Sequence, residues 1–177
     1  MFIIIVGIGV AGILLVFSVT TKASADPLIR KQMLAIAEAL MEEVQAKPFT
    51  YCDPDDTNAS TTPDTAGCAA AAENPGPEAV DTPPTGPAET RAGTVRPFDN
   101  VNDFGPSLTI NPITDLTTGT PIGGLGAYSA NIAVAGSALG GIVAAESLLI
   151  TVTVDGPGSE SLVLQGYRTR YAPKAVP

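Results

Sequence analysis

The chain has 177 residues, of which 18 are glycine, 16 are proline and 5% are aromatic, so it allows one domain with long loops. It contains no histidine, which excludes Ser-His-Asp and Cys-His catalysis as well as imidazole metal sites. Its formal net charge of −9 repels phosphate, so we expect no nucleic-acid partner. We therefore expect a protein that is not an enzyme and carries no cofactor.

The chain opens with a long apolar run. Residues 2–17 read FIIIVGIGVAGILLVF, and the first charge is Lys22. As a helix this run would be about 24 Å long, near the lower limit for a hydrocarbon core of about 30 Å. We expect residues 1–25 to form a membrane anchor. A cleaved secretory signal is the alternative, since residues 23–25 read Ala-Ser-Ala, although no basic residue precedes the apolar run.

An amphipathic helix is predicted over residues 26–48. Asp26 and Pro27 are typical of a helix start, as cap and first residue, and Pro27 would instead kink a helix that continued from the anchor. Apolar side chains then recur at helical spacing, and Pro48 ends the pattern. The predicted stripe consists of Ile29, Met33, Ile36, Leu40 and Val44.

The segment that follows is acidic and irregular in composition. Ten acidic residues and only two arginines lie between Asp53 and Asp103, a local balance of −8, while the rest of the chain is nearly neutral. Eight prolines fall within residues 53–97, so we predict a long surface loop, partly mobile, as the main feature of residues 49–106.

Cys52 and Cys68 are the only cysteines, and they enclose fifteen residues. If the anchored body lies outside the cytoplasm, the oxidising environment favours a disulfide between them. Two free thiols or a redox pair are the alternatives, and the chain lacks the Cys-x-x-Cys spacing that is typical of a redox pair.

Oxygen-bearing side chains crowd at two places in the acidic segment. Hard cations such as Ca²⁺ bind six to eight oxygens, so these places are weak candidates for a calcium site, without the glycine and closing glutamate of an EF-hand. Two turns stabilised by Asp and Asn side chains are the alternative. The candidate ligands are Asp53, Asp55 and Asp56 near Asn58, and Asp99, Asn102 and Asp103 near Asn100.

Strands are predicted in the C-terminal part, residues 107–177. The strongest is 148–154, where Ile150, Val152 and Val154 alternate with threonines, and a turn at 155–158 leads to a partner strand over 160–171. Residues 107–113 and 128–135 are shorter candidates. Helix first and strands afterwards is an α+β order, in which a long N-terminal hydrophobic helix packs on a C-terminal antiparallel β-sheet.

These features together resemble the type IV pilin family. The segments ADPLIRKQMLAIAEALMEEVQAKPFTYCDPDD, PFDNVNDF and GYRTRYAPKAVP are similar to minor pilins of mannose-sensitive haemagglutinin (MSHA) pili. The resemblance implies a type IV pilin-like fold and a non-catalytic role in the assembly, priming or tip structure of a pilus. A type II secretion pseudopilin, or a membrane-anchored extracellular binding module or adhesin, is the alternative.

The resemblance also implies partners and a location. Other pilins would pack against the N-terminal helix, and the pilus assembly machinery would act on the chain. The chain would cross the inner membrane once with a periplasmic head before entering the extracellular pilus. The basic leader and the Glu of type IV prepilins match no residue here, so their roles are assigned to none. The residues expected in the filament core are Ile4, Val6, Ile8, Ile13, Leu14 and Val16.

Overall fold

The computed structural model describes residues 27–69, 72–78 and 88–174. The predicted anchor, its filament-core residues and the cap Asp26 lie outside this range. Pro27 is the first described residue, and it is helical and exposed. Within the described part of the chain, the search for a helix with the length and apolar character of a membrane span gives no candidate.

The helix occupies residues 27–45 and ends shortly before Pro48, as predicted. Four members of the predicted stripe are buried and Ile29 is partly buried, while Ala37 and Met41 extend the buried face. The opposite face is exposed and carries charged side chains such as Lys31 and Glu38. The apolar spacing therefore identified the side of the helix that meets the rest of the protein.

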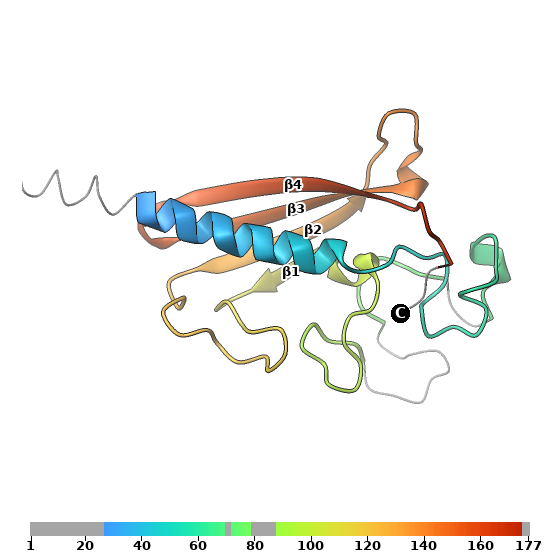
Figure 1. Cartoon of the computed structure of the whole chain (residues 1–177), viewed down its shortest axis with the longest axis horizontal. Coiled ribbons are helices and arrows are strands. Elements are labelled where there is room, and N and C mark those ends of the chain that lie inside the picture. Colours follow the sequence, from blue (N-terminus) through green and yellow to red (C-terminus); the bar gives the residue numbers. More distant parts are fainter. Residues whose placement is uncertain (1–26, 70–71, 79–87, 175–177) are drawn as a thin grey trace, which may run out of the picture.

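Four antiparallel strands form one sheet in the order β1-β2-β3-β4, and Figure 1 shows the helix lying along one face of it. Because each strand pairs with its neighbour in sequence, the sheet is a meander. The register places Ile132 opposite Val152 and Val152 opposite Leu164. The strands are β1 (Ser107–Ile110), β2 (Ser129–Gly136), β3 (Ser147–Asp155) and β4 (Ser161–Thr169).

One face of the sheet is buried and the other is polar. In β3, Ile150, Val152 and Val154 are buried, whereas Thr151 and Thr153 on the other face are partly exposed. The buried face joins the apolar face of the helix in one hydrophobic core. Together the helix and the sheet confirm the α+β prediction, with a helix packed on an antiparallel sheet.

The predicted strands all occur, with small changes at their ends. β1 stops at Ile110 rather than at residue 113, because Pro112 has no amide hydrogen to donate to a neighbouring strand. The turn before β4 contains η4 (Pro157–Ser159), a short 3-10 helix. Gly156 lies in this turn where the helix comes close: a Cβ there would be 2.9 Å from the Met33 sulfur.

The acidic segment between helix and sheet is irregular but partly buried. Its described residues form two 3-10 helices, η1 (Thr65–Gly67) and η2 (Val101–Phe104). Phe98 and Phe104 pack edge to face in the core with ring centroids 5.1 Å apart. Figure 1 shows these loops gathered around and beyond the C-terminal end of the helix.

Candidate functional site

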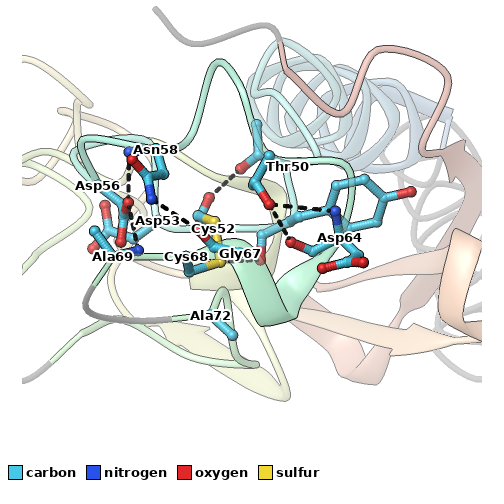
Figure 2. The surroundings of a disulfide bond; sticks show 12 residues. Thr50, Cys52, Asp53, Asp56, Asn58, Asp64, Gly67, Cys68, Ala69 and Ala72 are labelled. Atoms are coloured by element: carbon cyan, nitrogen blue, oxygen red, sulfur yellow. Dashed lines mark hydrogen bonds between the residues drawn. A yellow bond between two sulfur atoms is a disulfide. The ribbon is translucent and has the colours of Figure 1, made fainter.

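A disulfide joins Cys52 and Cys68, as the sequence predicted (Figure 2). The loop that it closes is also held by side chains. One oxygen of Asp56 accepts the backbone N–H groups of Asn58 at 2.7 Å and Ala69 at 3.1 Å. Asp56 therefore acts as a structural acceptor inside the disulfide loop, which is the turn role that the sequence left open for it.

The chain beyond the disulfide returns to the start of the acidic segment. Ala72 forms an isolated β-bridge with Cys52, and the Glu73 N–H donates to the Tyr51 carbonyl at 3.0 Å. A few residues later, the Gly76 N–H donates to the Asn102 carbonyl at 2.9 Å. These backbone contacts bring a glutamate from the proline-rich segment next to η2.

The start of η2 presents a second acidic side chain. A capping box forms there, in which one oxygen of Asp103 accepts the N–H groups of Asp99 at 2.8 Å and Asn100 at 2.7 Å. The Asn100 side chain donates to the Thr50 hydroxyl at 2.7 Å, deep in the structure. The Asp103 carboxyl group is thus held in one orientation, with its other oxygen, Oδ1, left without a hydrogen bond.

Seven carboxyl groups from these loops form three overlapping groups. Within each group, one oxygen per residue lies within 4.8 Å of the others, and Asp99 and Asp103 each belong to two groups. We call these seven residues the carboxylate cluster. The groups are Asp53, Asp55 and Asp99; Glu73, Glu78 and Asp103; and Glu89, Asp99 and Asp103.

The cluster joins residues that the sequence had placed at two separate sites. Asp53 and Asp55 come from the first predicted group, and Asp99 and Asp103 from the second. Asn102 is buried in η2, and its N–H donates to the Asn100 side chain. Both predicted turns occur as well. In the first, the Asp55 N–H donates to the Asp53 side chain at 2.7 Å, and in the second the Asn102 N–H donates to the Asn100 side chain at 3.3 Å.

Sequence reasoning missed Glu73, Glu78 and Glu89. They are scattered through a proline-rich stretch that has no ligand spacing, so no local pattern pointed to them. Glu78 and Glu89 are joined by a backbone hydrogen bond of 3.2 Å, which places their carboxyl groups together. The only signal in the sequence was the density of acidic residues between Asp53 and Asp103.

Burial makes this cluster electrostatically unusual. It raises the pKa of Glu73 to about 10, with further contributions from the nearby charges of Glu78 and Asp103. Burial and a hydrogen bond with Glu78 raise the pKa of Glu89 to about 9. The pKa values of Asp99 and Asp103 rise to about 7, mainly through burial. Near neutral pH the cluster therefore retains protons unless a cation neutralises it.

Little positive charge from the protein faces the cluster. Within the described residues, Arg96 forms an ion pair with Asp55, with 3.6 Å between Nη1 and Oδ2. Arg91, the other arginine of the acidic segment, pairs instead with Glu43 of the helix at 2.6 Å. In the part of the chain that the structure describes, one arginine thus pairs with the seven acids, and the donor set is made of oxygen alone.

A second surface feature lies along the helix. A groove of about 570 Å³ runs between the exposed alanines of the helix and the loop after β1. Ala35 and Ala39 line one side of the groove, and Leu116 and Ile122 line the other. The side chains of Leu116 and Ile122 are 42% and 41% exposed.

Comparison of the chain with models of protein families, with curated proteins and with solved structures found no match.

Proposed function

We propose that this chain is a minor pilin, a non-catalytic subunit that takes part in the assembly, priming or tip structure of a type IV pilus. The minor pilin MshD of the MSHA pilus system is the protein that its sequence resembles. The observation that carries the proposal is the helix of residues 27–45, which follows the apolar run in sequence and lies on a four-stranded antiparallel sheet.

The arrangement of polar and apolar surface supports this role. One face of the helix is buried against the sheet, while Leu28 and Leu34 on its outer face remain 60% and 40% exposed. In a filament, the helices of neighbouring subunits would cover such side chains. The outer face of the sheet carries many polar side chains, such as Thr151 and Gln165, and would face solvent.

The proposed partners follow from the apolar run. Before assembly, residues 2–17 would lie in the inner membrane with the head in the periplasm; in the pilus they would pack among the helices of other pilins. The apolar side chains expected at this contact include Ile4, Ile8 and Leu14. The closed Cys52–Cys68 disulfide agrees with a head outside the cytoplasm.

The test is a charge placed in the apolar run. We expect Ile8→Lys to remove the chain from sheared, purified filaments, because a lysine at the centre of an apolar helix costs about 2.5–3.5 kcal/mol in an apolar environment. The matched control is Val163→Lys, since Val163 is 58% exposed on the outer face of β4.

Two measurements accompany the filament assay. Closure of the Cys52–Cys68 disulfide reports that the head has folded, and membrane fractionation reports that the variant is still inserted. Wild-type amounts of Ile8→Lys in filaments would contradict the proposal. A variant that is folded, inserted and absent from filaments, beside a control that is incorporated, supports it.

A further inference from the structure

The strongest unexplained feature of the head is the part of the carboxylate cluster around Asp103, where two adjoining groups contain unpaired acceptor atoms. Both carboxylate oxygens of Glu73, Oε2 of Glu89 and Oδ1 of Asp103 are buried and have no hydrogen-bond partner. Glu89 and Asp103 are only 4% and 1% exposed. A buried polar atom without a partner costs about 1–3 kcal/mol, so four such atoms in two adjoining groups indicate that a ligand completes the site.

Hydrogen bonds of the backbone help to place these residues. Asp103 uses its other oxygen to accept two backbone N–H groups of the η2 capping box, which leaves Oδ1 for the centre. Glu73 is held through its backbone, by the hydrogen bond from its N–H to Tyr51. Because residues as far apart in the sequence as Glu73 and Asp103 supply these groups, the fold of the acidic segment brings the site together.

The chemistry of the site selects a hard cation. All side-chain donors are carboxylates, the chain contains no histidine, and both cysteines are consumed by the disulfide. Nitrogen- and sulfur-preferring metals therefore find none of their usual ligands here. Five carboxyl groups also offer enough oxygens for the six to eight that Ca²⁺ binds.

The number of carboxyl groups and their burial favour calcium over magnesium. The oxygens of each group lie within 4.8 Å of one another, close enough for one cation to contact them together. Magnesium also keeps several of its waters, which a buried set of protein carboxylates does not accommodate.

We propose that the head binds Ca²⁺ at Asp103, within the two adjoining groups that this residue forms with Glu73 and Glu78 and with Glu89 and Asp99, so that the ion ties the proline-rich segment to η2. This proposal does not depend on filament assembly. The ion would neutralise buried negative charge that Arg96, which pairs with Asp55, leaves in excess. In its absence the same carboxyl groups retain protons, which is the alternative way to neutralise them.

The test is direct calcium binding to the full-length chain, oxidised, solubilised in mild detergent and freed of metal with a chelator. We expect saturable binding by isothermal titration calorimetry with a Kd below about 1 mM, and a rise in melting temperature on adding Ca²⁺. We expect magnesium to bind at least about tenfold more weakly. Absence of saturable calcium binding up to that concentration, or equal affinity for the two metals, would overturn the proposal.

Amide variants locate the site. The double variant Glu73→Gln with Glu89→Gln preserves shape but removes two carboxyl groups that could lose their protons to bind the ion. Because both groups keep their protons in the metal-free head, the neutral amides should be tolerated there, so we expect a folded protein without calcium binding. The matched control is Glu38→Gln on the exposed face of the helix, which should bind calcium as the wild type does. Wild-type affinity in the double variant would overturn the assignment of the ligands, whatever the wild type binds.

Discussion

The ion pair between Arg91 and Glu43 fastens the acidic segment to the helix. Two nitrogens of Arg91 donate to the two oxygens of Glu43 at 2.8 and 2.6 Å, and the side chains are only 11% and 8% exposed. Arg91→Ala would leave the Glu43 carboxylate buried without its partner. Breaking a buried pair in this way costs about 3–5 kcal/mol, so we expect the free energy of unfolding to fall by about that amount.

The assay is urea unfolding of the full chain in mild detergent, followed by far-UV circular dichroism. The matched control is Arg30→Ala, whose pair with Glu160 spans 3.1 Å but has side chains 70% and 33% exposed. An exposed pair contributes about 0–1 kcal/mol. A loss in Arg91→Ala no larger than in the control would refute the reasoning that burial makes this pair structurally important.

Three further perturbations test the head. With calcium chelated, the free energy of unfolding should fall as pH rises from about 5 to 8. The pKa values of Glu73 and Glu89 are raised to about 10 and about 9, so over this range the folded state keeps protons that the unfolded state releases. Each retained proton contributes a slope of about 1.4 kcal/mol per pH unit, and stability that rises over this range in urea titrations would be contrary evidence. Reduction of the Cys52–Cys68 disulfide should lower the free energy of unfolding by about 3 kcal/mol in the same assay. An unchanged unfolding midpoint would argue against a stabilising role for the disulfide. Phe104→Ala should lower the free energy of unfolding by about 3–5 kcal/mol, because this side chain lies in the core and is 1% exposed. A decrease of less than about 1 kcal/mol would show that η2 does not stabilise the fold.

Elements with a local period could be predicted from the sequence. The four-three-four spacing that includes Met33 and Val44 fixed the buried face of the helix, and the alternation through Ile150 and Val152 identified the central strand. Both patterns work because a regular backbone repeats the direction of its side chains every few residues. The strand ends were less well defined, since Pro112 shortens β1.

The carboxylate cluster could be predicted only in part. The dense Asp and Asn residues near Asp53 and Asp103 were visible, but the sequence did not show that they meet. Their meeting depends on backbone contacts between distant segments, such as the one from Glu73 to Tyr51. No period connects Glu73 with Asp103, and proline-rich sequence gave no sign that its glutamates would be buried.

The most direct test of the proposed function is to look for this chain in the filaments of the organism that encodes it. Filaments are sheared from wild-type cells and from cells lacking the gene, and both are examined by mass spectrometry and electron microscopy. A minor pilin is present in the wild-type filaments, and its deletion reduces the number of pili or changes their composition. Wild-type filaments that lack the chain, together with unchanged piliation after its deletion, would contradict the proposal.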